Sequence, residues 1–480
     1  MKTVYFRADG NSKIGLGHVT RCLALADMLT GYFQGAFLVQ NPTDELAAQI
    51  REHHTLISLP ETSDYLAEAR EVSQKYLSAD NTVVLDGYEF RTEYQRIIQS
   101  SGTKLVCIDD LYAWHFVADA VINQAGGIEA TEYSRESYTK LYLGPAYALL
   151  RQPFLAAARR RLPLTDRDGL FVCFGGADPE NLTSRVVKAA VKANWTGKII
   201  AVTGSASARG KELASLRQTV PALEVHSSVD AAKMVSLMQQ CVVAVAPASG
   251  ISYEISSVGM YFITGHYVDN QKYLYRFLVE NNLALGADVF QEEKLIELLS
   301  EDRWSEPGIF EKQEKWFAGN SFRHLRGVFI RLALQVRRAT IGDMRTYFDW
   351  ANELETRKNS LNQSPISWSR HRAWFTDRIA DPGFAFYLFC LNDISVGQVR
   401  FGLVGGEATV SYSVDARYRG LGLGREMLSQ AVARLVEETD AVNVKGVVKD
   451  DNPASLATFE KIGFRPVHSA NGITEFELTL

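Results

Sequence analysis

The chain contains 480 residues, which is more than one hydrophobic core usually holds and predicts about three domains. Hydrophobic residues make up 46% and charged residues 22%, an ordinary globular composition, and the net charge of -5 gives no support to nucleic acid or an anionic membrane as a partner. No run reaches about 18 consecutive apolar residues and no signal peptide is recognised, so we expect no membrane-spanning helix and no secretion.

The opening of the chain predicts a strand, a glycine loop and a helix. An apolar strand at residues 4–6 breaks at Asp9, and the loop Gly15-Leu16-Gly17-His18 leads into an amphipathic helix. Glycines let the backbone approach a ligand closely, and the free N–H groups and dipole of a helix N-terminus favour an anion. The dipole also disfavours a proton on His18, and a neutral imidazole beside an anion site suits a general base.

Two known phosphate-binding motifs do not fit this loop. No Gly-Lys-Ser/Thr follows, as a Walker loop requires, and Thr20 stands where a dinucleotide fingerprint needs its third glycine. Spacing alone is equally compatible with a surface histidine at position 18 that caps the helix.

The run FRADGNSKIGLGHVTRCLALA, residues 6–26, resembles the opening of the UDP-sugar hydrolases of the pseudaminic acid pathway. These are relatives of the glycosyltransferases with two facing Rossmann-like domains, the GT-B type. The resemblance implies that His18, the histidine of the G-x-G-H motif, is the catalytic base. We assign Asp9, Gly15, Gly17 and Arg21 of this stretch to substrate and UDP binding.

Further strands alternate with helical stretches and predict a parallel sheet with helices on both faces. The expected strands lie at residues 36–40, 82–88, 104–110 and 118–124. Ligands bind at the carboxyl ends of such strands, where this chain has Asp86 with Tyr88, Asp109 with Asp110, and Asn123 with Gln124. Capping of the next helix is a simpler role for one of the paired aspartates. The resemblance implies that Tyr88 contacts the sugar.

Residues 156–169 are rich in arginine and proline, and we expect a linker between domains there, with Arg159 to Arg161 as solvated charges. A second alternating unit then begins, with strands expected at 170–174, 198–204, 223–228 and 242–250. Gly175, Gly176 and Asp178 lie between the first of these strands and a helix, where the backbone is able to approach phosphate. We assign these three residues to UDP binding.

The turn after the last of these strands is predicted to hold UDP. Ser249 and Gly250 begin a helix where a diphosphate can bind, and Glu254 can accept hydrogen bonds from ribose hydroxyls. A capping serine and a dipole-stabilised glutamate explain the spacing equally well. The resemblance favours the UDP role and implies that Asn270 and Gln271 face the sugar and phosphate.

Helices expected at residues 290–328 close the second unit, and the pattern changes again from Leu334. Three successive strands with short turns, at 385–392, 395–404 and 408–415, predict a largely antiparallel sheet. An R-x-x-G-x-G motif follows at Arg419, Gly420, Leu421, Gly422 and Gly424. Its bared N–H groups can hold a pyrophosphate before the next helix, and the motif resembles the acetyl-CoA loop of the GNAT N-acetyltransferases.

A second stretch resembles the GNAT family and places Asn452 and Ser455 near acetyl-CoA. Phe459 stands where the family usually has a tyrosine that protonates the departing thiolate, and a phenyl ring cannot donate a proton. Tyr412 is a candidate donor in its place, and water or an inactive domain are the alternatives.

Residues 337–375 resemble the start of GNAT enzymes that act on nucleotide-linked amino sugars. This implies an acceptor pocket shaped by Asn352, Arg357 and Trp374. A helical stretch from Trp350 to Phe375 that merely covers the sheet explains the tryptophans at least as well.

Together the resemblances imply an α/β bifunctional enzyme with domains at 1–155, 166–328 and 334–480. It is expected to hydrolyse UDP-2,4-diacetamido-2,4,6-trideoxy-β-L-altropyranose and to acetylate the 4-amino group of the precursor UDP-sugar with acetyl-CoA. The alternatives are a GT-B glycosyltransferase fused to a protein-amine acetyltransferase, or to an inactive acetyl-CoA-binding module. The expected partner is a UDP-linked amino or acetamido sugar.

No cluster of histidine, cysteine and carboxylate residues has metal-ligand spacing, so no metal is predicted. The five cysteines are an odd number, and Cys107, Cys173 and Cys390 lie in apolar runs, as buried thiols of a reducing compartment do. The cytoplasm is therefore the expected location.

Overall fold

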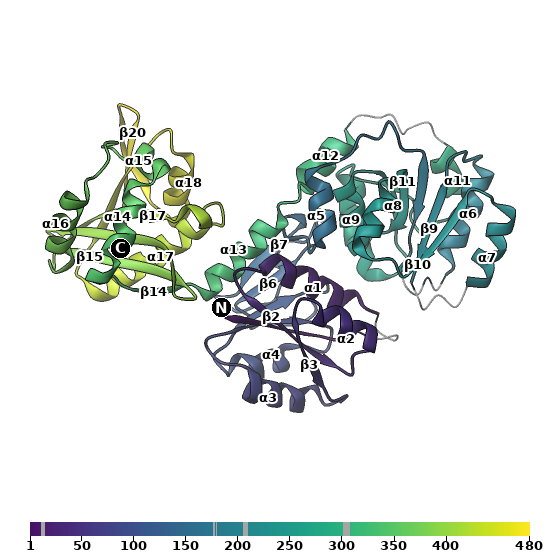
Figure 1. The fold of residues 1–480 in the computed structure, drawn as a ribbon, viewed down its shortest axis with the longest axis horizontal. Helices are drawn as coiled ribbons and strands as arrows, with labels where there is room; N and C mark the ends of the chain where they lie inside the picture. Colours follow the sequence, from purple (N-terminus) through teal and green to yellow (C-terminus); the bar gives the residue numbers. More distant parts are fainter. Residues whose placement is uncertain (11–14, 176–177, 179, 205–209, 301–307) are drawn as a thin grey trace. The chain divides into compact units, whose positions relative to one another are not determined.

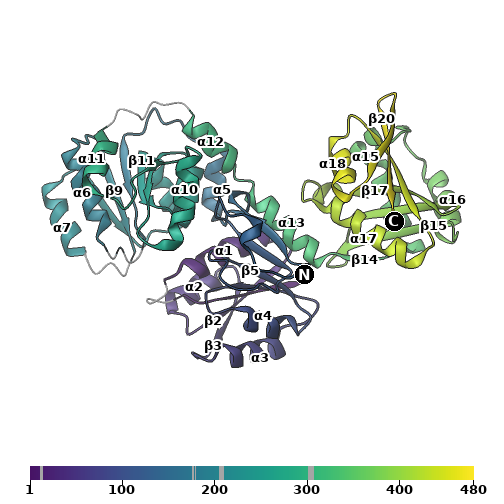
Figure 2. The ribbon, with the colours of Figure 1, turned by 180° about the vertical axis from the view of Figure 1, so that it is seen from behind.

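A computed structural model describes the chain except for residues 11–14, 176–177, 179, 205–209 and 301–307. The backbone forms two compact units, Met1–Leu325 (unit 1) and Arg326–Leu480 (unit 2). Figure 1 colours the chain from purple to yellow along the sequence, and Figure 2 shows it from behind. Among the described residues, no helix combines the length and the apolar character that a membrane span needs.

The first sheet of unit 1 is parallel throughout and runs in the order β3-β2-β1-β4-β5-β6-β7. Its strands are β1 (Thr3–Ala8), β2 (Gln34–Gln40), β3 (Thr55–Leu59), β4 (Thr82–Asp86), β5 (Lys104–Ile108), β6 (Ala120–Asn123) and β7 (Lys140–Leu143). The helices are α1 (Gly17–Leu29), α2 (Asp44–Arg51), α3 (Tyr65–Tyr76) and α4 (Thr92–Gln99), with α1 and α2 on one face and α3 and α4 on the other (Figure 1). The predicted parallel sheet is confirmed, and every residue of β4 is buried, as expected for a strand covered on both faces.

Arg7 forms a buried ion-pair network inside this sheet. Its guanidinium is fully buried and contacts both oxygens of Asp9 at 2.6 and 2.8 Å and both oxygens of Glu68 at 2.7 and 2.9 Å. Tyr94 donates to Glu68 at 2.9 Å, and the guanidinium lies over the ring of Phe90. Burial lowers the pKa of Arg7, but the two carboxylates outweigh it and raise the pKa overall, so the charge is retained.

The second sheet of unit 1 is also parallel, in the order β10-β9-β8-β11-β12-β13. Its strands are β8 (Gly169–Val172), β9 (Ile199–Thr203), β10 (Leu223–Ser227), β11 (Cys241–Pro247), β12 (Tyr261–Gly265) and β13 (Leu285–Gly286). The helices around it are α6 (Leu182–Lys192), α7 (Gly210–Thr219), α8 (Ala231–Met238), α9 (Gly250–Val258), α10 (Lys272–Glu280), α11 (Glu292–Ser300) and α12 (Ile309–Trp316).

The predicted linker at 156–169 is more ordered and more buried than its composition suggested. Helix α5 (Gln152–Arg159) extends into it. Arg161 donates to the carbonyl oxygens of Ser256 and Phe310, and buried Arg167 donates to that of Gly259. The prediction of solvated arginines was therefore wrong for Arg161, because backbone carbonyl oxygens accept from both of its terminal nitrogens.

Unit 2 contains a mixed sheet in the order β14-β15-β16-β17-β18-β20-β19. Its strands are β14 (Gln335–Arg338), β15 (Phe384–Leu391), β16 (Ile394–Val404), β17 (Glu407–Val414), β18 (Asn443–Lys449), β19 (Arg465–Ala470) and β20 (Ile473–Thr479). The pairs are antiparallel except β17 with β18, which are parallel and pair only from Glu407 to Thr409. Beyond Thr409 these two strands are no longer paired, and Tyr412 lies on that part of β17.

The helices of unit 2 are α14 (Met344–Asn352), α15 (Leu354–Asn359), α16 (Trp368–Ile379), α17 (Leu423–Glu438) and α18 (Pro453–Ile462), and α13 (Ser321–Ala333) leads into it. The predicted continuous helical stretch from Trp350 to Phe375 is interrupted between α15 and α16. Trp350 is buried with Phe375 against β15, as the covering interpretation expected.

Substitution of Arg7 by methionine should destabilise unit 1 by about 3 to 5 kcal/mol, because it leaves two buried carboxylates without their counter-charge. Hydrogen exchange of the amides of β1 measures the loss within unit 1. Lys75→Met, which breaks the exposed Lys75–Glu71 pair, is the control and should leave exchange unchanged. Equal protection in both variants would contradict the role given to the buried network.

Candidate active sites

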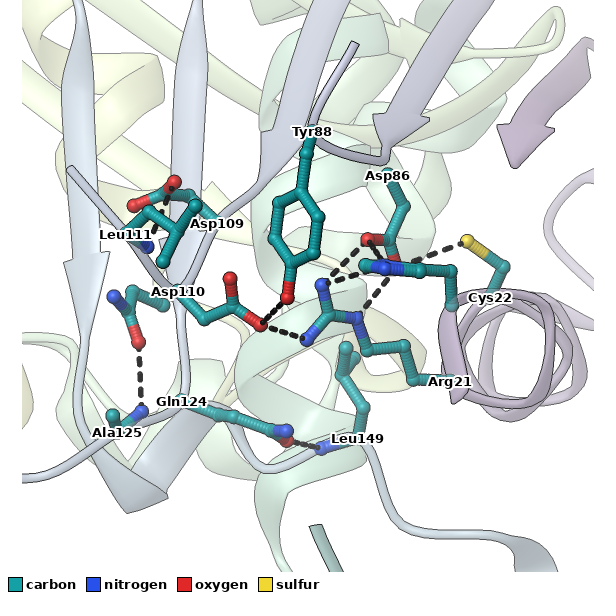
Figure 3. Close-up of polar contacts among 12 residues, drawn as sticks. Arg21, Cys22, Asp86, Tyr88, Asp109, Asp110, Leu111, Gln124, Ala125 and Leu149 are labelled. Atoms are coloured by element: carbon teal, nitrogen blue, oxygen red, sulfur yellow. Dashed lines mark hydrogen bonds and ion pairs between the residues drawn. The ribbon is translucent and has the colours of Figure 1, made fainter. Parts of the chain in front are cut away.

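Three ionisable side chains, His18, Arg21 and Asp86, meet where β4 ends and α1 begins. β1 pairs with β4, so the helix that follows β1 starts beside the last residue of β4, Asp86. His18 Nδ1 lies 2.7 Å from Asp86 Oδ1, and Arg21 donates to Asp86 Oδ2 from Nε at 2.6 Å and to Oδ1 from Nη2 at 2.5 Å. Figure 3 shows the guanidinium of Arg21 between Asp86 and Asp110.

The charge on Asp86 determines how His18 is protonated. Asp86 is fully buried, and burial raises its pKa, but Arg21 and His18 outweigh burial and hold the pKa below its usual value. A carboxylate only accepts hydrogen bonds, so His18 Nδ1 carries the proton and Nε2 is left as the basic atom. The sequence predicted His18 but not Asp86 as its hydrogen-bond partner.

Tyr88 and Asp110 complete the surroundings of His18. The ring of Tyr88 meets that of His18 edge-on at 5.0 Å between centroids, and its hydroxyl donates to Asp110 Oδ2 at 3.5 Å. Arg21 Nη1 donates to the same oxygen at 3.2 Å. Burial and then the charge of Asp110 raise the pKa of Tyr88 to about 12, while a hydrogen bond with Asn270 opposes the rise. Four predicted residues, His18, Arg21, Tyr88 and Asn270, therefore lie in one place.

Two of the three helix N-termini assigned to anion binding in unit 1, those of α1 and α9, have open space beside their glycines. Gly15 has a φ of +80°, which favours glycine, and neither Gly15 nor Gly17 has an atom within 4 Å of where a Cβ would stand. Leu16, which precedes α1, offers no capping side chain. Gly250 begins α9 and likewise faces open space, but Ser249 and Ser252 form a capping box at this terminus, in which Ser252 Oγ accepts from the backbone N–H of Ser249 and the Ser249 side chain accepts from that of Ser252. The capping role considered for Ser249 is therefore confirmed, and its role in binding UDP stays a prediction.

Glu254 is held by an arginine from another element of unit 1. Arg151, which precedes α5, contacts Oε1 of Glu254 from Nε at 2.9 Å and from Nη2 at 2.8 Å. Burial raises the pKa of Glu254, and Arg151 opposes the rise. Both contacts go to Oε1, and the ribose interaction of Glu254 stays a prediction that would use Oε2.

Three residues assigned to substrate are already hydrogen-bonded within the protein. Both oxygens of Asp9 bind Arg7, those of Asp178 accept from the backbone N–H groups of Leu182 and Thr183, and Gln271 Oε1 accepts from the N–H of Tyr267. The carboxylate of Asp178 thus occupies the N-terminus of α6, which corrects our expectation that this terminus is available to the phosphates of UDP. Gly175 has a φ of +78° and an open Cβ position, and Gly176 lies outside the described residues.

The paired aspartates after β5 have different roles. Asp109 accepts from the N–H groups of Leu111 and Tyr112 and from the hydroxyl of Tyr133 at 2.8 Å. It therefore closes a turn by accepting from backbone N–H groups, which is similar to the capping role considered for one of the two aspartates. Asp110 instead faces Arg21 and Tyr88. No group of three or more histidine, cysteine or acidic side chains with the geometry to hold a metal is found in the part of the chain that the structure describes.

The glycine loop of unit 2 connects β17 to α17 as predicted. Gly420 and Gly422 have φ values of +76° and +74°, and Gly422 precedes α17 without a capping side chain. Arg419 donates to Glu353 Oε2 at 2.6 Å and to Thr356 Oγ1 at 3.2 Å. Burial raises the pKa of Glu353, but hydrogen bonds from Arg419 and from two backbone N–H groups outweigh it and hold the pKa at about 2. Arg419 therefore ties the start of the loop to α15.

Tyr412 lies beside the residues of the second predicted motif. Its hydroxyl is 3.0 Å from Ser455 Oγ, and Asn452 both accepts from the N–H of Ser455 and donates to its hydroxyl at 3.1 Å. A Cβ on Gly424 would stand 3.2 Å from the Tyr412 ring. Phe459 is buried, with its ring 6.2 Å from that of Tyr412. Tyr412 is thus a hydroxyl donor close to the first turn of α17.

The sequence was compared with known proteins and families. Residues 333–465 match the family model of the acetyltransferase (GNAT) domain. Over 473 residues, 95% of either chain, the sequence is 21% identical to an uncharacterized protein of Methanocaldococcus jannaschii. It is 26% identical over 301 residues to the spore coat polysaccharide biosynthesis protein SpsG of Bacillus subtilis, and the matched region is 61% of this chain and 86% of SpsG. It is 24% identical over 213 residues to the UDP-2,4-diacetamido-2,4,6-trideoxy-beta-L-altropyranose hydrolase of Campylobacter jejuni, and the matched region is 42% of this chain and 70% of that hydrolase.

The chain is therefore homologous to a UDP-sugar hydrolase over part of its length and carries a GNAT domain towards its C-terminus. The resemblances drawn from the sequence motifs are confirmed at this level. A GNAT domain implies the use of acetyl-CoA.

Arg331 was not predicted, because it lies on α13, before the residues that match the GNAT family. It donates from Nη1 to the carbonyl oxygen of Leu421 at 2.7 Å, and a Cβ on Gly327 would stand 2.4 Å from the same oxygen. Helix α13 thus contacts the glycine loop at the carbonyl oxygen of Leu421 and supports its backbone.

Arg331→Ala should weaken acetyl-CoA binding about tenfold, because the loop loses one charge-assisted hydrogen bond worth roughly 1.5 kcal/mol. Isothermal titration of the full chain with acetyl-CoA measures this. Arg434→Ala, which removes an arginine farther along α17 that pairs with Glu438 at 3.9 Å, is the control. Equal affinities for both variants would show that α13 does not support the loop.

Proposed function

We propose that the chain is a bifunctional nucleotide-sugar enzyme of pseudaminic acid biosynthesis. Unit 2 transfers acetyl from acetyl-CoA to the 4-amino group of UDP-4-amino-4,6-dideoxy-N-acetyl-β-L-altrosamine. Unit 1 then hydrolyses the product, UDP-2,4-diacetamido-2,4,6-trideoxy-β-L-altropyranose, to free sugar and UDP. The partial similarity to a protein named for this hydrolysis, in a chain that also carries a GNAT domain, supports this pairing of activities.

The observation that carries the hydrolase proposal is the hydrogen bond between His18 and buried Asp86, beside the open start of α1. With its proton on Nδ1, His18 accepts a proton from water at Nε2. The hydroxide formed attacks the anomeric carbon from the face opposite UDP, and the bond between that carbon and the diphosphate oxygen breaks. UDP leaves with the electron pair, and the configuration at the anomeric carbon is inverted.

The charge that develops on UDP needs donors that are already oriented. Asp178 occupies the start of α6, so we assign this role to the start of α9, where Ser249 and Gly250 lie. Oε2 of Glu254 accepts from the ribose, while Tyr88 and Asn270 contact the sugar in a cleft between facing Rossmann-like domains of the GT-B type.

His18→Asn should retain UDP binding and release almost no free sugar, and Asp86→Asn should lower kcat by roughly 10²- to 10⁴-fold, because a neutral amide no longer fixes the imidazole tautomer. Release of sugar and UDP from the diacetamido substrate measures both. His115→Asn, which removes a histidine bonded to Ser134 and Glu136, is the control and should remain active.

Near-normal turnover of His18→Asn would remove the imidazole from the mechanism. Transfer of the sugar to an added acceptor hydroxyl, in place of hydrolysis, would instead make unit 1 a glycosyltransferase.

Acetyl transfer in unit 2 requires a neutral amine that attacks the thioester of acetyl-CoA. A carbon–nitrogen bond forms, the bond from the carbonyl carbon to sulfur breaks, the attacking nitrogen loses one proton to water, and the departing thiolate takes up a proton. Phe459 cannot supply this proton, so we assign it to the hydroxyl of Tyr412, which forms a hydrogen bond with Ser455.

Mass spectrometry of a UDP-4-amino sugar incubated with acetyl-CoA and the full chain should show one added acetyl group. Tyr412→Phe should lower kcat about 10- to 100-fold and leave acetyl-CoA affinity unchanged, because it removes one proton donor and little contact area. Thr458→Val, a change at a neighbouring hydroxyl that donates to Ala454, is the control. Full activity of Tyr412→Phe would assign protonation of the thiolate to water.

A further inference from the structure

The face of the unit 2 sheet against which α14 and α16 pack is apolar on β15 and polar on β16 and β17. On β15 this face carries Phe386, which packs with Phe375 of α16. Across β16 and β17 the same face carries Gln398, Arg400, Ser411 and Ser413, because Arg400 is paired with Phe386 and Ser411, and Gln398 with Ser413. We call these last four residues the polar strip. Side chains of this kind on a covered face need partners that a hydrophobic core does not provide.

Arg400 has no hydrogen-bond or ion-pair partner among the described residues. Its guanidinium lies over the ring of Trp374, 4.9 Å from the centroid. Burial lowers the pKa of Arg400, and the neighbouring charge of Arg357 lowers it further, although the guanidinium stays charged. Arg400 itself is half-buried, whereas Gln398 is buried, and Gln398 Oε1 has no hydrogen-bond partner among the described residues. The strip therefore contains an uncompensated positive charge and an unused polar group.

Arg357 brings a second charge without a carboxylate. Its terminal nitrogens donate to the carbonyl oxygens of Asn362 and Ser364 and to the hydroxyl of Ser360, while its buried Nε has no partner. Other arginines of unit 2 do have acidic partners: Arg337 with Asp343, Arg345 with Asp349, and Arg419 with Glu353. Two adjacent arginines that lack such a partner repel each other unless an anion binds between them.

One of the two arginines, Arg357, lies on the helix that contacts the cofactor loop. Arg357 follows Thr356 on α15, and Thr356 together with Glu353 contacts Arg419 at the start of that loop. An anion bound at Arg357 and Arg400 is thus linked to the acetyl-CoA loop through one short helix.

We propose that Arg400, Arg357 and the polar strip bind a phosphate group of the amine acceptor. This inference rests on the acetyl transfer proposed for unit 2, and it adds that the acceptor is anionic. Guanidinium groups bind phosphate oxygens in pairs, and the diphosphate of a nucleotide-linked amino sugar supplies the missing counter-charge. A polyamine or a basic peptide would add positive charge to this site and is disfavoured as acceptor.

Binding of inorganic pyrophosphate to the full chain saturated with CoA tests the site directly, whether or not the UDP-sugar is a substrate. Isothermal titration should show that Arg400→Met has one pyrophosphate site fewer than wild type, or that its affinity for pyrophosphate at one site is at least tenfold lower. Arg345→Met is the matched control: Arg345 also lies over a tryptophan, Trp368, but is exposed and pairs with Asp349. Wild-type binding by Arg400→Met would overturn the proposal and leave Arg400 as a packing residue on Trp374.

Acetyl-transfer kinetics then separate this inference from the proposed function. For Arg400→Met, KM for the UDP-4-amino sugar should rise at least tenfold, while KM for acetyl-CoA and for the same amino sugar without UDP stay unchanged. If wild type acetylates no UDP-amino sugar while the pyrophosphate site is lost in Arg400→Met, the proposed function fails and the anion site stands. A parallel rise in all three constants would show that Arg400 is structural.

Discussion

The site in unit 1 depends on one buried carboxylate. Asp86 has no exposed surface, and a charge in such a place is tolerated only when it is paired and hydrogen-bonded. Arg21 supplies the compensating charge and His18 one further hydrogen bond, so the same interactions that keep Asp86 ionised also hold the imidazole in place. Because the pKa of Asp86 is held below its usual value, its contribution to stability is complete above the pKa of an unfolded aspartate and is lost as the pH falls through the folded value.

Local patterns of the sequence predicted much of unit 1, and what they missed is not local. The strands from β1 to β11 with apolar runs, the glycine loop and His18 can all be recognised from short stretches of sequence. The pairing of His18 with Asp86 joins residues 68 positions apart, and only the strand order β1-β4 brings them together. Edge strands such as β3 and β7, which are less buried, escaped prediction because they lack a long apolar run.

Three residues that we expected to bind substrate instead form hydrogen bonds within the protein, and they do so for a common physical reason. Asp9, Asp178 and Gln271 are polar residues beside loops at strand ends, where sequence reasoning expects a ligand. In the structure the carboxylate of Asp178 satisfies helix N–H groups and the amide of Gln271 closes a turn. Capping and ligand binding use the same residue types at the same positions, so spacing cannot distinguish them. Their roles in binding substrate remain predictions.

The two sites proposed for a diphosphate differ in how their arginines are compensated, and the proposed reactions give a reason. In unit 1 the charge of Arg21 is compensated by Asp86 and Asp110, so a diphosphate would rely on helix N–H groups near Ser249. Charge develops on the diphosphate during hydrolysis, and oriented dipoles stabilise a charge that appears in the transition state. In unit 2 the diphosphate would take no part in the chemistry. Uniform binding is then sufficient, and arginines without acidic partners, such as Arg400, provide it.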